Sequence, residues 1–126
     1  MKIAVTANGT DLDAPASPVF GRCSTYILVD TETMQYEALA NPAVASGGGA
    51  GIQAAQFIVE HGAEAVVTGN VGPNALGVFN AAGIPVYLNK GGTVRQAVQA
   101  YQEGLLSSTS DATVSAHAGM GRGRKR

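Results

Sequence analysis

Two glycine-rich segments are the parts of this sequence whose residue types and spacing could do chemistry. Residues 46–53 read SGGGAGIQ, and residues 69–74 read GNVGPN. A pattern of helical periodicity follows each segment, so backbone N–H groups would collect at a helix N-terminus, where an anion is favoured. The alternative is structural, since glycine also permits a sharp turn and close packing of a helix on a sheet. Both segments are candidates for an anion-binding site.

The glycine spacing in residues 46–53 does not match the common nucleotide-binding loops. A dinucleotide fingerprint, G-x-G-x-x-G, that began with Gly47 and Gly49 would need a third glycine where Ile52 stands. A Walker A loop needs lysine followed by serine or threonine, and no lysine lies between Lys2 and Lys90. The segment therefore predicts a generic anion cradle or a hinge.

The two segments are expected to lie at one rim of the fold. Residues 69–74 follow a short apolar run that predicts a parallel strand, and ligands in open α/β sheets bind beyond the carboxyl ends of such strands. The glycines would supply backbone donors, and two asparagines would add uncharged amides. The predicted ligand-binding residues of the two loops are Gly47, Gly48, Gly49, Gly51, Gly69, Asn70, Gly72 and Asn74.

Few side chains could bind a metal or pair with an anion. Cys23 is the single cysteine; its thiolate would suit an iron–sulfur cluster, although a cysteine at the start of a strand is also a common packing residue. Arg22 is either an anion partner or half of a surface ion pair. His61 suits a helix end, and His117 lies near the C-terminus. No C-x-x-C spacing occurs, so a cluster would also need backbone donors, Arg22 or a second subunit.

The elements that must position these residues follow from the apolar pattern. Short apolar or alternating runs predict strands, and apolar residues three and four apart predict helices. The predicted strands are 2–7, 26–29, 34–39, 65–68 and 84–88, and the predicted helices are 52–61, 73–82 and 93–103. Thr93 and Gln96 form a capping box at the third helix, and Pro85 places the last strand at a sheet edge.

This order of elements predicts one α/β domain over residues 1–106. It is expected to have three layers, α/β/α, with a mixed sheet that is mostly parallel and has one antiparallel strand from a hairpin. The same order also occurs in ribonuclease H-like folds. Residues 107–126 are polar, end in Arg-Gly-Arg-Lys-Arg, and predict a disordered tail with a basic end.

The cysteine count and the first residues bear on the compartment. A single cysteine cannot form an intrachain disulfide, which favours a reducing environment. The first residues, MKIAVTANGTDLD, contain neither a secretory apolar region nor a membrane span. The sequence is therefore expected to belong to a cytoplasmic protein without membrane partners.

Four segments of the chain resemble a known family. They are FGRCSTYILVDTET (20–33), NP followed by GGGAGIQAAQ (41–56), VVTGNVGPNALGVFNAAGIPVY (66–87) and GTVRQAVQAYQEGLL (92–106). In order and spacing they are similar to the dinitrogenase iron-molybdenum cofactor biosynthesis family, the small NifX and NifB-C-terminal-like proteins. Related sequences often carry histidine before Phe-Gly-Arg, where this chain has Val19, so Cys23 is the remaining candidate metal ligand.

The resemblance implies both a fold and a function. The fold would be ribonuclease H-like, and the function would be that of a non-enzymatic carrier or chaperone of an iron–sulfur or iron-molybdenum-type cluster in nitrogen fixation. A partner protein in cofactor assembly and a homodimer are expected with it. A descendant could instead bind another small anionic ligand at the same loops.

Two other classes of function compete with a cofactor carrier. An interaction or regulatory module could use the sheet edge or the basic tail, although no aromatic residue interleaves the tail's charges as nucleic-acid stacking would require. A metal-dependent nuclease of this fold would place carboxylates on the first strand, and residues 2–7 have none. Asp11, Asp13 and Asp30 fall where turns are expected, which favours turn formation over metal binding.

Overall fold

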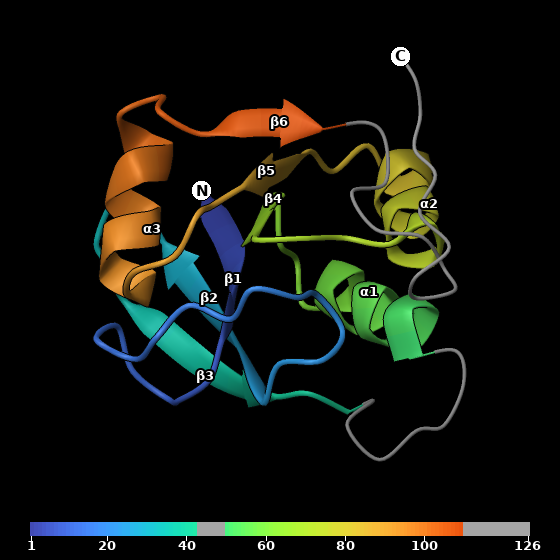
Figure 1. Cartoon of the computed structure of the whole chain (residues 1–126), viewed down its shortest axis with the longest axis horizontal. Coiled ribbons are helices and arrows are strands. Elements are labelled where there is room, and N and C mark those ends of the chain that lie inside the picture. The colour runs from blue at the N-terminus through green and yellow to red at the C-terminus, as the bar shows by residue number, and fades with distance from the viewer. Residues whose placement is uncertain (43–49, 110–126) are drawn as a thin grey trace.

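Six strands form one mixed sheet in the order β3-β2-β1-β4-β5-β6, and the computed structural model describes residues 1–42 and 50–109 of the chain. The strands are β1 (Lys2–Ala7), β2 (Thr25–Asp30), β3 (Tyr36–Ala40), β4 (Ala65–Thr68), β5 (Val86–Leu88) and β6 (Ser107–Thr109). The helices are α1 (Ala50–Glu60), α2 (Pro73–Ala82) and α3 (Val94–Gln102). Helices α1 and α2 cover one face of the sheet and α3 covers the other (Figure 1), so the fold has the three layers that were predicted.

Two apolar cores lie on the two faces of the sheet because successive strand residues point to opposite sides. On β1, Ala4 belongs to the core under α1 and α2, whereas Ile3 and Val5 belong to the core under α3. Strands β1, β2 and β4 are buried on both faces, which explains their nearly continuous apolar sequences. All three strands therefore contribute residues to both cores.

The helix boundaries follow their local sequence signals. The Thr93 hydroxyl accepts a hydrogen bond from the Gln96 N–H at 3.1 Å, and the Thr93 N–H donates to the Gln96 side chain at 3.0 Å, which confirms the capping box. Gly62 and Gly83 follow α1 and α2 with φ of 83° and 73°. These values lie in the left-handed region that favours glycine at a helix C-terminus.

The directions of the strands differ in part from the prediction. Strands β1, β4 and β5 pair in parallel, and β3 runs in the same direction. Strand β2 is antiparallel to its neighbours, as the hairpin predicts, but β6 is a second antiparallel strand. The expectation of one antiparallel strand is therefore wrong, whereas the mixed α/β class is confirmed.

Strand β6 also changes the expected edge of the sheet. Ser107 pairs with Leu88 and Thr109 pairs with Val86, so β5 is an inner strand of the sheet. Pro85 precedes β5 rather than occupying it, and its carbonyl accepts a hydrogen bond from the Val66 N–H at 3.0 Å. Three polar residues carry no apolar alternation, which is why the pattern placed 107–109 in the tail. The rest of the predicted tail, 110–126, lies outside the described residues.

The hairpin between β2 and β3 begins its second strand later than the alternation suggested. Met34 has a φ of 62°, which is uncommon for a residue other than glycine, and its N–H donates to the Asp30 carbonyl at 2.8 Å. The Asp30 carboxylate accepts from the Glu32 N–H at 2.9 Å. The predicted turn therefore exists but extends through Met34, and β3 begins at Tyr36.

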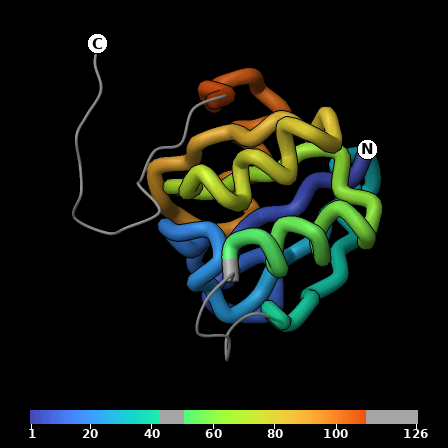
Figure 2. The backbone as a smooth tube through the Cα atoms, turned by 90° about the vertical axis from the view of Figure 1, so that its right-hand side faces the viewer, coloured from blue at the N-terminus to red at the C-terminus, as the bar shows by residue number. Residues whose placement is uncertain are grey.

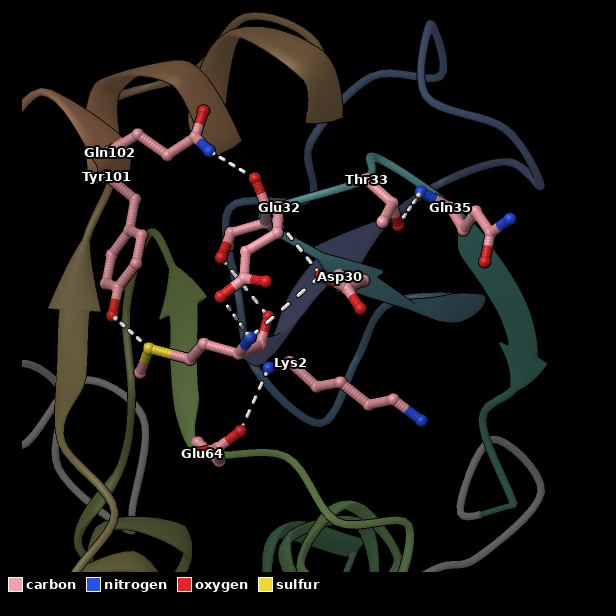
Figure 3. A network of polar contacts seen from close by, with 10 residues as sticks. Lys2, Asp30, Glu32, Thr33, Gln35, Glu64, Tyr101 and Gln102 are labelled. Carbon is pink, nitrogen blue, oxygen red and sulfur yellow. Dashed lines mark hydrogen bonds and ion pairs between the residues drawn. The ribbon is translucent and has the colours of Figure 1, made fainter.

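The N-terminal residue is part of the folded structure. The Met1 carbonyl accepts a hydrogen bond from the Thr31 N–H at 2.9 Å, and the Met1 amine lies 3.9 Å from a carboxylate oxygen of Asp30. The Tyr101 hydroxyl donates to the Met1 sulfur at 3.4 Å, and the Lys2 N–H donates to the Glu64 carboxylate at 3.1 Å (Figure 3). This network joins the amino end of β1 to the hairpin turn and to α3.

The Asp30 carboxyl should titrate below its ordinary range. The Glu32 N–H, and secondarily the positive charge of the Met1 amine, lower the pKa of Asp30. A carboxyl whose pKa is lower in the folded state stabilises the fold at pH values above its unfolded-state pKa. This stabilisation is lost as pH falls through the folded-state pKa. We expect Asp30→Asn to reduce the acid sensitivity of unfolding below about pH 4. Denaturant unfolding at several pH values, with carboxyl titration by NMR, checks this; an unshifted Asp30 pKa contradicts it.

Candidate functional site

The loops that follow β1, β4 and β5 gather at one end of the sheet. These three strands are parallel, so their carboxyl ends point the same way, and residues 8–24, 69–72 and 89–93 form the three loops beyond them. Helices α1 and α2 lie side by side above one face (Figure 2). This end of an open α/β sheet is the usual place for a ligand.

The first turns of α1 and α2 meet at this end. A Cβ placed on Gly51 would lie 3.6 Å from the Ala75 nitrogen and 3.8 Å from the Asn74 Cβ. Gly21, with a φ of 92°, lies against Gly51 from the loop that follows β1. The structure therefore brings together the described part of the first glycine segment and the start of the helix after the second.

The N-terminus of α2 has unused hydrogen-bond donors. Gly72 is the N-cap residue and provides no side-chain cap, and Pro73 follows it. In the described part of the chain, the N–H groups of Asn74 and Ala75 donate to no acceptor, whereas the Leu76 N–H donates to the Gly72 carbonyl at 3.1 Å. Unused donors at a helix N-terminus are the feature that binds anions.

At the N-terminus of α3, in contrast, the first backbone N–H groups already have hydrogen-bond acceptors. Its first N–H groups donate to carbonyls of the loop after β1: Val94 to Ala14 at 3.0 Å and Arg95 to Leu12 at 2.7 Å. The Gln96 N–H is taken by the capping box. Of these two helix starts, α2 is therefore the one that offers donors to a ligand.

Gly69 and Asn70 hold the loops together. A Cβ on Gly69 would lie 2.5 Å from the Pro18 carbonyl oxygen and 2.9 Å from the Pro18 Cα, so only glycine allows this approach. The Asn70 carbonyl accepts from the Phe20 N–H at 3.0 Å, and its side-chain amide donates to the Pro18 carbonyl at 3.4 Å. Both predicted ligand-binding residues thus have structural contacts that account for them.

Arg22 is an exposed cation near the same end of the sheet. Its backbone N–H donates to the Val19 carbonyl at 3.3 Å, which closes a turn next to Gly21. Within residues 1–42 and 50–109, its guanidinium makes no ion pair. The surface ion pair considered as its alternative role is therefore not seen there, and the charge is available to an anion.

Cys23 lies in the core and not at the surface near the first turns of α1 and α2. Its side chain is 0% exposed and packs in the same cluster as Phe20 and Tyr26. Burial raises the pKa of the Cys23 thiol, an effect only partly offset by nearby hydrogen-bonding groups, the Tyr26 hydroxyl first among them. A neutral, buried thiol is a packing residue, so the position favours this interpretation over the metal-ligand hypothesis.

Tyr26 is a buried polar residue that no sequence signal marks as a site residue. Its hydroxyl is fully buried near Cys23 and makes no well-formed hydrogen bond among the described residues. Burial, reinforced by the neighbouring Cys23, raises the pKa of Tyr26 well above its usual range. Its ring packs against Phe20, with centroids 5.2 Å apart, and Phe20 packs on Phe79. An alternating strand pattern gives no signal for such a hydroxyl.

Asn41 positions the loop that carries Arg22 and Cys23. Its buried side-chain amide donates to the carbonyls of Gly21 at 3.1 Å and Cys23 at 2.9 Å, and its N–H donates to the Ser24 carbonyl at 3.0 Å. In the sequence, Asn41 stands out only as part of a family segment, 41–56. A buried amide that satisfies two carbonyls is a positioning residue.

Several predicted residues lie elsewhere. Gly47, Gly48, Gly49 and His117 lie outside the described residues. His61 follows α1 at its C-terminal end, where a ring nitrogen lies 2.8 Å from the Phe57 carbonyl, consistent with the predicted structural role.

The nuclease arrangement of carboxylates does not occur in the described part of the chain. Asp13 pairs with Arg95 at 3.1 Å beyond the carboxyl end of β1, whereas Asp30 lies opposite Lys2 at the amino end of that strand. Residues 1–42 and 50–109 hold no group of three His, Cys, Asp or Glu side chains that could bind a metal ion.

Comparison with known proteins assigns the chain to a family. The profile of the dinitrogenase iron-molybdenum cofactor family matches residues 1–104. The chain belongs to this family. An uncharacterised protein of Methanocaldococcus jannaschii is 32% identical over 109 residues, which cover 84% of this chain and 89% of that protein. None of the described helices is both long and apolar enough to span a membrane.

Two solved structures are similar to this chain over most of its length. The apo form of the orange protein from Desulfovibrio gigas is 42% identical, with a TM-score of 0.85 over 89% of this chain and 95% of that one. A proposed NifB protein from Thermotoga is 36% identical, with a TM-score of 0.78 over 89% of this chain and 96% of that one. The chain therefore shares its fold with both proteins over most of its length.

Replacing Gly69 tests the close approach of the two loops. We expect Gly69→Ala to lower the free energy of unfolding by about 1–3 kcal/mol, because a Cβ would overlap the Pro18 carbonyl. Gly77→Ala, in the middle of α2, is the matched control: its Cβ would meet nothing within 4 Å. That change should add about 0.5–1 kcal/mol from helix propensity. Denaturant unfolding measures both, and equal stability of the two variants would contradict the contact.

The reactivity of Cys23 tests its burial. In the folded protein the thiol should react with Ellman's reagent at least about 100-fold more slowly than in the unfolded chain. This ratio corresponds to a free energy of about 3 kcal/mol for the local unfolding that exposes the sulfur. The reaction rate is measured with and without denaturant. A folded-state rate equal to the unfolded one would place the sulfur at the surface and restore Cys23 as a candidate metal ligand.

Proposed function

We propose that this protein is a non-enzymatic carrier that binds a preassembled, anionic metal–sulfur cofactor of the iron–sulfur or iron-molybdenum type. The proposed site is the rim where the first turns of α1 and α2 meet, with Gly47–Gly51, Gly72, Asn74 and Arg22 as its contacts. The observation that carries the proposal is the unused pair of donors at Asn74 and Ala75, directly beside Gly51.

The electrostatics of this rim support an anionic ligand. Each helix N-terminus carries a partial positive charge of about half an elementary charge, and two such ends lie together here. Arg22 adds a full positive charge that has no ion-pair partner among the described residues. In a domain whose other charges are mainly acidic, this local excess of positive charge attracts an anion.

The residues at the rim suit a cofactor that already contains its sulfur atoms. They suit a bare metal ion less well, because a bare ion needs protein ligands. The described residues provide N–H donors and a guanidinium at the rim, and the Cys23 thiol is buried behind it. Bridging sulfides accept hydrogen bonds from backbone N–H groups, which also tune the cofactor. A bond from Cys23 to the cofactor would require the cluster of Phe20 and Tyr26 to open.

The comparisons support a role in cofactor handling. The family is described by the iron-molybdenum cofactor of dinitrogenase, and the similar orange protein was solved in an apo form. Delivery to a partner protein in cofactor assembly, a homodimer and the ribonuclease H-like classification belong to the same proposal. The alternative of an interaction module would use the sheet edge, which β3 or β6 forms in the described part of the chain, or the tail, most of which lies outside the described residues.

Anaerobic purification and reconstitution test the carrier function. We expect visible absorption, together with metal and acid-labile sulfide approaching one cofactor per chain. Arg22→Gln should weaken cofactor binding by about 10-fold, because it removes one charged hydrogen-bond donor. Gly51→Val should weaken binding further, since its methyl groups would separate α1 from Asn74 and Ala75.

The control is Gly77→Ala, which changes α2 away from its N-terminus and should leave the absorption unchanged. Unfolding is measured for every variant, so that loss of binding is separated from loss of fold. A wild-type protein that stays colourless and free of metal and sulfide after reconstitution contradicts the proposal. Equal loss of stability and binding in Gly51→Val would return the loop to a structural role.

A further inference from the structure

A cavity lies beside the loop that follows β4. The cavity, of about 300 Å³, is lined by residues 16–18, 69–70 and 89–91, which come from the loops after β1, β4 and β5. Its volume is at the lower end of the range for small-molecule sites. None of the residues after β5 was predicted to bind a ligand.

The cavity lies where the chain changes sides of the sheet. Strands β4 and β5 are parallel neighbours, with Val66 opposite Val86. After β4 the chain continues to α2 on one face, and after β5 it continues to α3 on the opposite face (Figure 1). Two adjacent loops that leave in opposite directions open a crevice between them. Ligands of open α/β sheets bind in this kind of crevice.

The loop that carries Lys90 is held in shape by its neighbours. The Asn89 N–H donates to the Thr68 carbonyl at 2.8 Å, and the Asn89 side-chain amide donates to the Gly91 carbonyl at 3.1 Å. Lys90 is exposed between these two anchored residues and makes no ion pair within the described part of the chain. A cation is therefore presented at the cavity on a fixed backbone.

The lining determines the class of ligand. Lys90 is the charged residue of the lining, and no carboxylate lines the cavity, which disfavours a cation. Asn70, Asn89 and Ser17 add polar groups, while Ala16 and Pro18 add apolar surface. The α3 N-terminus supplies no free donor here, because its first N–H groups are already bonded. The charge that selects a ligand therefore comes from Lys90.

We propose that this cavity binds a small organic anion, a carboxylate or a phosphate monoester, with its charged group on the Lys90 ammonium and its carbon skeleton over Ala16 and Pro18. This site is separate from the rim of α1 and α2, and it does not depend on the cofactor. The protein would then have two anion sites, one on each side of residues 69–72.

Titration of the full chain without added metal tests this site. Malonate and glycerol 3-phosphate are the probes for the two anion types, and choline is the cationic control; binding is followed by backbone amide shifts in NMR spectra. We expect amide shifts in residues 16–17, 69–70 and 89–91 with at least one of the two anions and none with choline; Pro18 has no amide N–H. Lys90→Gln should weaken binding by about 10-fold, and Lys90→Arg should stay within about twofold.

The matched control is Lys2→Gln, an exposed lysine at the opposite end of β1, which should leave anion binding unchanged. Absence of shifts at millimolar probe, shifts confined to other residues, or equal binding by wild type and Lys90→Gln would each overturn the proposal. Because no cofactor is present in this titration, its outcome is independent of the reconstitution experiment, and failure of either proposal is recognised separately.

Discussion

The close contact between Gly69 and Pro18 is the constraint on which the ligand end of this protein depends. It brings the loop after β1 onto the loop after β4 at a distance that no side chain allows. Hydrogen bonds from Phe20 to Asn70 and from Asn70 to Pro18 continue the contact. Because the loop after β1 also carries Arg22 and supplies the carbonyls that cap α3, this single approach sets the positions of both proposed sites.

The two sites differ in what supplies the positive charge. At the α1–α2 rim, unused N–H groups and helix dipoles act together with Arg22, and such fixed donors suit a multiply charged cofactor with many acceptor atoms. At the β4–β5 crevice, the first N–H groups of α3 are bonded to carbonyls of the loop after β1, and Lys90 is the charged residue of the lining. The rim therefore suits a rigid cofactor, and the crevice suits a smaller organic anion.

Sequence patterns predicted the layers, the three helices and five of the six strands because those signals are local. Periodicity, caps and glycines at helix ends depend on residues within a few positions of one another. The polar strand β6 has no such signal, since its place depends on backbone pairing with β5. For the same reason Asn41 was not selected as a site residue, because its side-chain amide bonds to carbonyls about 20 residues earlier in the chain.

The sequence by itself determined the family, the α/β class and the two glycine segments, because each is encoded by consecutive residues. The tertiary structure alone decided that Gly51 meets Asn74 and Ala75, and that Cys23 is buried in the core with Phe20 and Tyr26. It also decided that the chain changes sides of the sheet between β4 and β5. These outcomes depend on which faces of the helices and strands pack together, a property that no short segment of the chain contains.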